Sequence, residues 1–295
     1  MLAVVGTVPE PDFPLITGEV VLADGTVSIK GRHASVNRGT PALLAATVKV
    51  CEALGQPAPM GCLVGDTGLG EGSRRLYEYL AQEVGRWGVE AVAFHYLQPD
   101  VDWHNRVLFA VQDMAKPPLL MADAGFMYAA KMSGFSCEYA LFTPDVGELA
   151  FLADEEAPHP FYTRGFILHE DIKVPRLIER AYAHQNAAAC LLVKGQPDYV
   201  VGRDGIHATI DTPVTEAMEA IGGTGDTVTG IVAALIASGL EVREAAISAA
   251  RVNRLAGFAA RPTPATQVID IVTHIPAALT QVLEENRCSA GRQHG

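Results

Sequence analysis

A glycine-rich segment followed by an aspartate carries the strongest chemical signal in the sequence. Residues 222–226 read Gly-Gly-Thr-Gly-Asp and lead into a small, apolar stretch that predicts a helix over 226–238. Glycine permits positive φ and leaves no Cβ in the way, so a ligand can approach the backbone closely. The amides of Gly223, Thr224 and Gly225 can then converge on an anion at the positive end of the helix dipole. We therefore expect these three residues to form an anion hole.

Asp226 falls in the first turn of that predicted helix, beside the expected anion. A carboxylate there can remove the proton from a hydroxyl group while the amides stabilise the charge on a phosphoryl group in transfer. The structural alternative is an ordinary N-cap aspartate after a flexible loop. The neighbouring glycines and the small-residue helix favour the chemical interpretation, so we predict that Asp226 is the catalytic base.

The elements that must position this segment form an alternating pattern. Strand-length apolar segments occupy residues 60–64, 91–96, 119–122, 139–142 and 190–194, and helical patterns occupy residues 41–54, 73–87, 146–153 and 174–184. Such alternation indicates βαβ units, a mainly parallel sheet with helices on both faces, and a ligand site at the C-terminal ends of the strands.

The last third of the chain follows a different pattern. Residues 198–201 and 206–210 predict an antiparallel hairpin at the sheet edge, and the three final helices are expected over residues 226–238, 241–260 and 273–285. With neither an internal repeat nor a low-complexity linker in view, we predict a single domain over residues 1–295. Its polar end, residues 286–295, is expected to be a frayed, flexible tail.

Composition and charge exclude several classes of function. The chain has 295 residues and a formal net charge of −12, with 49% hydrophobic and 19% charged residues. A chain of this length buries a large core. Its acidic balance argues against nucleic-acid and anionic-membrane partners, since both require cationic patches. We therefore expect small-molecule partners.

Cysteine spacing and the N-terminus bear on the cellular compartment. The five cysteines include no C-x-x-C pair, so we expect buried free thiols rather than disulfides or a zinc site. The first residues lack the pattern of a signal peptide, and no segment approaches the ~18 apolar residues of a membrane span. These features predict a soluble, cytoplasmic protein.

The segment from Gly222 to Leu240 resembles the signature of the ribokinase superfamily, and its double glycine is similar to the ATP/ADP-dependent NAD(P)H-hydrate dehydratase branch, also called carbohydrate kinase-like. The resemblance implies a ribokinase-like three-layer α/β/α fold with a mainly parallel central sheet. It also implies that ATP or ADP, with Mg²⁺, phosphorylates the hydroxyl of a nicotinamide hydrate, and that eliminating the phosphate regenerates the cofactor. A sugar, vitamin or nucleoside kinase and a non-catalytic nucleotide sensor remain open, and the superfamily allows a homo-oligomer.

A second motif with polar residues lies at residues 143–148, which read Thr-Pro-Asp-Val-Gly-Glu. The dehydratase branch has Thr-Pro-His-Pro-Gly-Glu here, so Asp145 stands where His or Asn is expected. Asp145 and Glu148 lie three residues apart on one helix face and can hold Mg²⁺ through water near the phosphates. The structural alternative is a capping box, with Asp145 at the N-cap and Glu148 at N3.

Further site residues follow from the resemblance. Asp123 ends a predicted strand in a stretch that resembles the Asp-Ala-Asp motif of the dehydratases, which puts it on the substrate or metal side; turn formation is its alternative. Lys194 and Gly195 resemble the Leu-Lys-Gly strand end that borders the nucleotide, although a solvated lysine would fit equally well. Gly222 and Asn253 complete the expected nucleotide-binding set.

The first hundred residues depart from the dehydratase pattern. The usual Gly-Pro-Gly-Leu-Gly loop is missing after Tyr96, where the chain continues Leu-Gln-Pro-Asp-Val-Asp-Trp-His. We expect a polar loop around His95 and His104 rather than a metal site. The glycines of residues 65–72 suggest a P-loop, but Glu71 stands where Gly-Lys-Ser/Thr is required, so that interpretation fails. The resemblance extends from residue 119 to residue 276.

Overall fold

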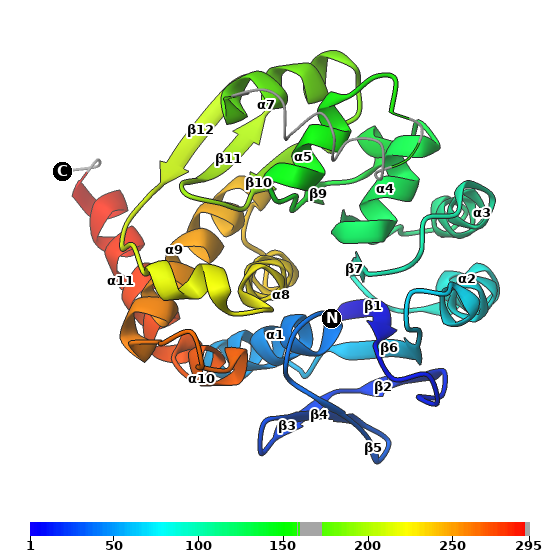
Figure 1. Ribbon diagram of the computed structural model, residues 1–295, viewed down its shortest axis with the longest axis horizontal. Coiled ribbons are helices and arrows are strands. Elements are labelled where there is room, and N and C mark those ends of the chain that lie inside the picture. Colours follow the sequence, from blue (N-terminus) through cyan, green and yellow to red (C-terminus); the bar gives the residue numbers. More distant parts are fainter. Residues whose placement is uncertain (158, 160–172, 293–295) are drawn as a thin grey trace.

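The computed structural model describes residues 1–157, 159 and 173–292, and is organised around a curved nine-stranded sheet (Figure 1). At its centre, β1 (Leu2–Val8) is fully buried and pairs in parallel with β6 (Met60–Gly65) and β7 (Ala91–His95). The sheet order is β12-β11-β10-β9-β8-β7-β1-β6-β2. The remaining strands are β2 (Ile16–Glu19), β8 (Leu119–Ala122), β9 (Leu141–Phe142), β10 (Cys190–Val193), β11 (Asp198–Gly202) and β12 (Gly205–Ile210).

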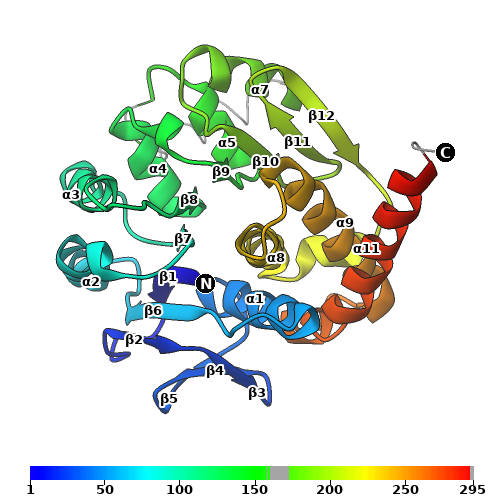
Figure 2. The same cartoon turned by 180° about the vertical axis from the view of Figure 1, so that it is seen from behind.

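Helices cover both faces of this sheet because successive strand residues point to opposite sides. On β1, Leu2 and Val4 belong to one hydrophobic core, and Ala3 and Val5 belong to the other. The first core packs against α1 (Thr40–Leu54), α8 (Thr224–Ala237), α9 (Val242–Ala260), α10 (Val268–Val272) and α11 (Ile275–Arg292). The second packs against α2 (Glu71–Glu83), α3 (Val101–Gln112), α4 (Ala124–Met132), α5 (Val146–Ala153) and α7 (Val174–Ala183). Figures 1 and 2 show these two groups of helices on opposite sides of the sheet, which confirms the expected three-layer α/β/α architecture.

Smaller elements complete the described chain. A separate antiparallel sheet lies below β2 in Figure 1 and contains β3 (Val21–Ala23), β4 (Thr26–Ile29) and β5 (Arg32–Ser35). Three 3₁₀ turns cover Val84–Arg86, Ser136–Glu138 and Glu216–Ala220. Among the described residues, no helix combines the length and the apolar character needed to cross a bilayer.

Several expectations need correction. The segment after β7 is not a polar loop throughout, because Asp100 caps α3 through the amide of Trp103. The expected frayed tail is helical as far as Arg292, and residues 293–295 lie outside the described chain. All five cysteines are free as expected, but only three of them are buried, while Cys137 and Cys288 are exposed.

The crossing of α1 and α8 holds the glycine-led helix against the sheet. A Cβ on Gly230 would lie 2.2 Å from the carbonyl oxygen of Leu43, so the two backbones can approach this closely only with glycine at that position. The buried hydroxyl of Thr47 donates to the carbonyl oxygens of Leu43 and Gly230 at 2.9 and 3.2 Å. This contact fixes the position of α8, and with it the glycine-rich segment at its start.

We expect Gly230→Ala to lower the free energy of unfolding by about 1–3 kcal/mol, because the added methyl group overpacks the contact with α1. Urea unfolding of the two proteins measures the difference. Gly85→Ala is the matched control, since its new Cβ would meet nothing closer than 3.6 Å. Equal stability losses in both variants would show that the helix crossing tolerates a side chain.

Candidate active site

The N-terminus of α8 presents free backbone donors. Gly223 is its N-cap, with φ of 97°, and within the described part of the chain no side chain caps this helix. The first N–H groups of an α-helix have no intrahelical acceptor. The amides of Thr224 and Gly225, in the first turn, are therefore placed to bind a ligand, as an anion hole requires.

A cavity of about 450 Å³ opens beside this helix end and has the size of a cofactor site. Five predicted residues line it: Lys194, Gly195, Thr224, Gly225 and Asn253. Its other lining residues are Gln196, Asp198, Pro213, Val214, Thr215, Glu216, Met218, Glu219, Val228 and Arg254. A second hollow, of about 480 Å³, lies between residues 9–14 and 31–33 and contains none of the predicted site residues.

Gly222 and Gly223 are absent from the residues that line the cavity. A Cβ on Gly222 would lie 3.7 Å from the Cβ of Arg38, and one on Gly223 would lie 3.1 Å from the Cα of Arg38 and 3.2 Å from Ala42. These two glycines therefore pack against the loop that precedes α1. Of the residues predicted for the anion hole and the nucleotide, these two are absent from the cavity lining. The other predicted site residues, Asp123, Asp145, Glu148 and Asp226, do not line it either.

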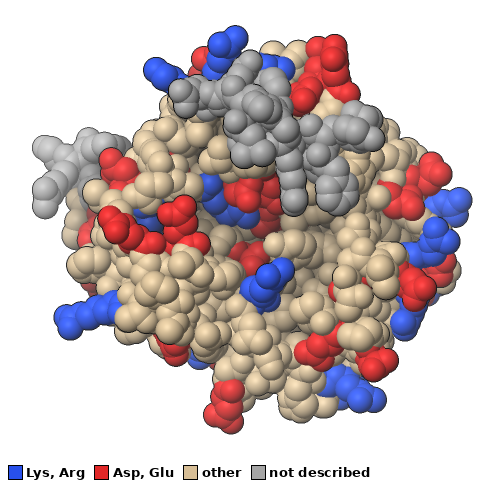
Figure 3. Space-filling model, in the orientation of Figure 1, with Lys and Arg blue, Asp and Glu red and all other residues tan. Residues whose placement is uncertain are grey.

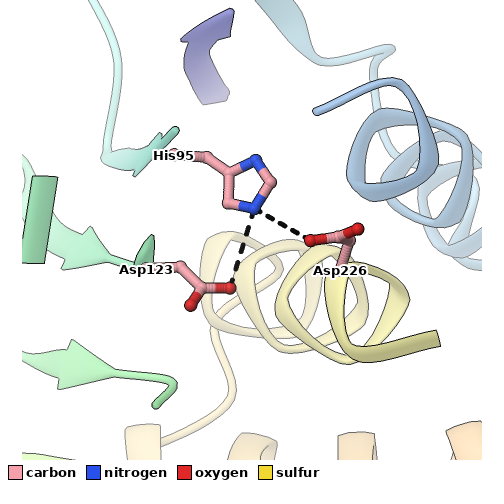
Figure 4. Close-up of side chains that lie close together, drawn as sticks. All are labelled: His95, Asp123 and Asp226. Atoms are coloured by element: carbon pink, nitrogen blue, oxygen red, sulfur yellow. Dashed lines mark hydrogen bonds and ion pairs between the residues drawn. The ribbon is translucent and has the colours of Figure 1, made fainter. Parts of the chain in front are cut away.

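Asp226 is buried, with 8% of its surface exposed, and both of its oxygens are engaged. Oδ2 accepts a hydrogen bond from the Gly39 amide at 2.6 Å, and Oδ1 lies 3.0 Å from Nε2 of His95 (Figure 4). Burial alone would raise the pKa of Asp226, but the hydrogen bond and charge of His95, followed by the charge of Lys194, lower it overall. The carboxylate is therefore ionised near neutral pH and held in one orientation.

Asp123 connects the other polar groups of the site. It is the N-cap of α4, and its side chain accepts from the Ala124 amide at 2.9 Å. Nζ of Lys194 lies 3.0 and 2.9 Å from its two oxygens, and the hydroxyl of Thr229 donates to Oδ2 at 2.6 Å. The two interpretations of Asp123 are thus compatible, because its carboxylate caps the start of α4 and also contacts the polar groups of the site.

Lys194 is a buried cation rather than a solvated strand-end lysine. Its side chain is 12% exposed. Burial opposes its charge, but Asp123, Glu148 and Asp226 together raise the pKa of the ammonium group. Nζ lies 3.8 Å from the position that a Cβ on Gly225 would take. The charge therefore borders the amides at the start of α8.

His95, Asp123 and Asp226 each offer one ligand atom, and these atoms lie within 4.8 Å of one another (Figure 4). This spacing would suit a transition metal. Lys194, however, already supplies a positive charge 2.9 Å from Oδ2 of Asp123, and Nε2 of His95 is bonded to Asp226. The donor atoms are thus satisfied by one another, which disfavours a metal ligated directly by this cluster.

Asp145 and Glu148 form the capping box that the sequence offered as the structural alternative. The Glu148 amide donates to Oδ1 of Asp145 and the Asp145 amide donates to Oε2 of Glu148, both at 2.8 Å. Oε1 of Glu148 accepts from the hydroxyl of Tyr128 at 3.2 Å. Burial, with the neighbouring Asp123 charge, raises the pKa of Glu148 to about 8. Asp145 is exposed, and its Oδ2 has no protein donor in the described chain.

Two further residues that line the cavity, Arg254 and Asp198, were not assigned a role from sequence. Arg254 is buried, and its Nε donates to Oδ2 of Asp198 at 2.7 Å, while its NH2 group donates to the Gly195 carbonyl at 2.9 Å. This ion pair shapes the cavity wall. The amide group of Asn253 bonds to Thr227 at 2.6 Å and to the Thr224 carbonyl at 3.2 Å. Asn253 therefore braces the first turn of α8.

His95 is the residue that sequence reasoning missed most clearly. It ends β7, is fully buried, and faces Asp226 across the site. Its position at the C-terminal end of an apolar strand was the available signal. His104 is also buried, but it lies in α3, where its Nε2 is 2.8 Å from the Tyr139 hydroxyl. The two histidines therefore belong to different parts of the fold.

The glycines of residues 65–72 serve a structural purpose. Asp66 Oδ1 accepts from the amides of Gly68 and Gly70 at 2.9 and 3.1 Å, and Oδ2 accepts from the amide and hydroxyl of Ser73 at 2.7 Å. An internal carboxylate thus occupies the start of α2, where a P-loop would bind phosphate.

The space-filling view shows acidic and basic side chains close together near the middle of one face of the molecule (Figure 3).

Comparisons with known proteins show the family to which the chain belongs. A family model described as NAD(P)H-hydrate dehydratase matches residues 98–277. An uncharacterized protein of Methanocaldococcus jannaschii is 39% identical over 243 residues, which cover 82% of this chain and 100% of that protein. The ADP-dependent (S)-NAD(P)H-hydrate dehydratase of Cenarchaeum symbiosum is 31% identical over 139 residues, which cover 47% of this chain and 43% of that enzyme.

Solved structures identify the fold. A ribokinase-like superfamily protein of Enterococcus faecalis has a TM-score of 0.56 with 15% identity, covering 95% of this chain and 87% of that one. This likeness confirms the expected ribokinase-like architecture. Since the family model matches more than half of the chain, over residues 98–277, the chain belongs to the NAD(P)H-hydrate dehydratase family.

Proposed function

We propose that this protein is a nucleotide-dependent NAD(P)H-hydrate dehydratase that works by phosphoryl transfer from ADP or ATP. The observation that carries the proposal is the uncapped N-terminus of α8, whose residues Thr224 and Gly225 line the cavity of about 450 Å³ and whose next residue is the buried Asp226. A phosphate bound at this helix end would lie beside the cavity and near the base. The name of the Cenarchaeum symbiosum relative supports ADP as the phosphate donor.

The cavity suits a nucleotide in one orientation. Its apolar lining, from Pro213, Val214, Met218 and Val228, can contact a purine base. The phosphates then extend toward the amides at the start of α8 and the ammonium group of Lys194. In this arrangement Lys194 offsets charge on the terminal phosphate while it remains bonded to Asp123.

In the proposed reaction the hydroxyl of the hydrate binds next to Asp226. Its oxygen attacks the terminal phosphorus, its proton passes to Asp226, and the bond from phosphorus to the leaving nucleotide oxygen breaks. The neighbouring ring carbon then loses a proton to the departing phosphate, the C–H electron pair forms the ring double bond, and the C–O bond breaks with its electron pair on the phosphate oxygen. The products are NAD(P)H, inorganic phosphate and the shortened nucleotide. The amides of Thr224 and Gly225 stabilise the charge on the transferred group.

Mg²⁺ fits this site through water rather than by direct ligation. Asp145 is exposed and keeps Oδ2 available, whereas both oxygens of Glu148 already accept hydrogen bonds. Hydrated Mg²⁺ is commonly held by one or two carboxylates together with substrate phosphates. When bound, the ion would neutralise phosphate charge, and Asp145 and Glu148 would orient its water ligands.

We expect Asp145→Asn to raise the Mg²⁺ concentration for half-maximal activity by about 10-fold, as for residues that act on a metal through its ligands. Asparagine caps helices as well as aspartate does, so stability should change little. Asp100→Asn, at the N-cap of α3, is the matched control. Activity titrated with MgCl₂ measures the effect, and identical titration curves for both variants would remove Asp145 from the ion site.

The function itself is tested by recovery of the reduced-nicotinamide absorbance. Purified protein is mixed with NADH hydrate and either ADP, ATP or no nucleotide. We expect absorbance to return only with a nucleotide, with one equivalent of phosphate released per cofactor restored. Nucleotide consumption only with an unrelated alcohol would instead indicate a small-molecule kinase. Thermal stabilisation by nucleotide without any turnover would indicate a sensor.

A further inference from the structure

A chain of hydrogen bonds connects α1 and β7 to Asp226. Oγ1 of Thr40, the first residue of α1, lies 3.0 Å from Nδ1 of His95, and Nε2 of His95 lies 3.0 Å from Oδ1 of Asp226. Thr40 and His95 are both fully buried. Because solvent does not reach Thr40 or His95, the hydrogen bonds of these two side chains are made within the protein, and the geometry of the Asp226 carboxylate depends on them.

The protein is built closely around these two side chains. A Cβ on Gly6, in β1, would lie 2.5 Å from Oγ1 of Thr40 and 2.7 Å from the carbonyl oxygen of His95. Glycine at this point lets the hydroxyl and the imidazole meet. Thr40 and His95 also lie outside residues 98–277, to which the family model matches. The pair therefore belongs to the divergent part of the chain.

The bonding pattern also defines the state of the imidazole ring. An ionised carboxylate only accepts hydrogen bonds, so Nε2 of His95 must carry the hydrogen that is shared with Asp226. The hydroxyl of Thr40 can donate to a bare Nδ1. The same hydroxyl can accept from a protonated Nδ1, because it is both donor and acceptor. Thr40 thus keeps Nε2–H directed at Asp226 in both charge states of His95.

We propose that Thr40 and His95 are positioning residues for the base, which together orient the Asp226 carboxylate toward the substrate hydroxyl. The role rests on the proposed function of Asp226. His95 is hydrogen-bonded to Oδ1 and the Gly39 amide is hydrogen-bonded to Oδ2. These two bonds restrict rotation of the carboxylate about the Cβ–Cγ bond of Asp226. The lone pair that remains on each oxygen then has a fixed direction, which general-base catalysis requires.

Several charged and titratable groups face this carboxylate. His95 comes from β7, Asp123 follows β8 with Oδ2 at 3.8 Å from the ring, and Lys194 follows β10. Glu148 lies on α5, and the ring of Tyr96 meets the His95 ring edge-on at 4.2 Å between centroids. After burial, which acts in the opposite direction, His95 has the largest effect in lowering the pKa of Asp226. Loss of His95 should therefore raise that pKa.

The experiment compares wild type with His95→Gln, Thr40→Val and Thr40→Ser across pH. We expect His95→Gln and Thr40→Val to lower kcat by about 10- to 100-fold, the usual effect of losing a supporting contact of this kind. The KM for the nucleotide should stay near the wild-type value. For His95→Gln the acidic limb of the pH profile of kcat should move to higher pH. With a raised pKa, Asp226 becomes ionised, and therefore able to act as a base, only at higher pH. Thr40→Ser keeps the hydroxyl and should retain most of the activity.

Thr47→Val is the matched control, because Thr47 is also a buried threonine of α1 but bonds to carbonyl groups in the crossing with α8. It should lose stability without any change in the pH profile. If Thr47→Val and Thr40→Val behave alike in both respects, or if His95→Gln keeps the wild-type kcat and pH profile, the positioning role is wrong.

A second measurement separates this inference from the proposed function and does not depend on a folded His95 variant. Nitrogen NMR of the imidazole groups in wild type and Thr40→Val reports which ring nitrogen carries hydrogen. We expect His95 to carry hydrogen on Nε2 in wild type and to lose this single state in Thr40→Val. A wild-type ring with hydrogen on Nδ1 alone would overturn the inference. Absence of dehydratase turnover with the expected spectrum would refute only the proposed function.

Discussion

Replacing Asp226 with asparagine is expected to lower kcat by about 10²- to 10⁴-fold, the range for loss of a general base. The amide has the shape of the carboxylate and can still accept the bond from Gly39, but it cannot take a proton from the substrate hydroxyl. Nucleotide affinity should change little, because the nucleotide contacts the helix amides and the cavity rather than this side chain. Steady-state kinetics and nucleotide titration by calorimetry measure the two effects separately.

Asp113→Asn provides the control for Asp226→Asn, since Asp113 is an exposed aspartate at the end of α3. It should behave as wild type in both assays. Turnover by Asp226→Asn within a few-fold of wild type would mean that Asp226 is structural. Loss of nucleotide binding in that variant would mean that the carboxylate supports the cavity instead of the chemical step.

Replacing Lys194 with methionine should have the largest effect on stability. The substitution leaves the carboxylate of Asp123, which is 1% exposed, without its neutralising cation. Breaking a buried pair from one side typically lowers the free energy of unfolding by about 3–5 kcal/mol. Activity should also be lost, because the cation bordering the phosphate site is gone. Urea unfolding measures the stability loss, with the exposed Lys116→Met as the control.

The double variant Lys194→Met, Asp123→Asn tests the reason for that loss. Removing the charge of Asp123 abolishes the uncompensated buried carboxylate, so the double variant should recover part of the stability lost by Lys194→Met alone. It should remain inactive, since the cation at the phosphate site is still missing. Additive losses from the two substitutions would show that the ion pair does not account for the effect of Lys194→Met.

Local sequence patterns predicted those helices and strands whose ends are determined by neighbouring residues in the chain. The helix expected over 146–153 has those bounds in the structure, because a capping pair opens it and the chain turns polar after Ala153. The helix expected over 226–238 is also present, but it begins two residues earlier than predicted, at Thr224, and ends at Ala237. Asp123 and Lys194 each end an apolar strand, and parallel strands bring such ends to one edge of the sheet. Their ion pair follows from that topology.

Two features could not be predicted from the sequence: contacts between residues far apart in the chain, and helices or strands that lack a periodic hydrophobic pattern. His95 and Asp226 are separated by 131 positions and meet only because β7 and α8 pack together. The helix α4 was missed because it is apolar and buried over most of its length, so it lacks an amphipathic period. Strand β1 is buried on both faces and shows no alternation for the same reason. Burial in the centre of the fold thus removes the signals that identify surface elements.

In the proposed mechanism the hydrate hydroxyl is phosphorylated before it leaves. The most direct test uses NADH hydrate whose hydroxyl carries isotopically labelled oxygen, converted with nucleotide in unlabelled water, followed by mass analysis of the phosphate. Phosphoryl transfer to the hydroxyl predicts that the labelled oxygen appears in inorganic phosphate, because the C–O bond breaks after the O–P bond forms. Labelled oxygen found in water, with unlabelled phosphate, would contradict the mechanism.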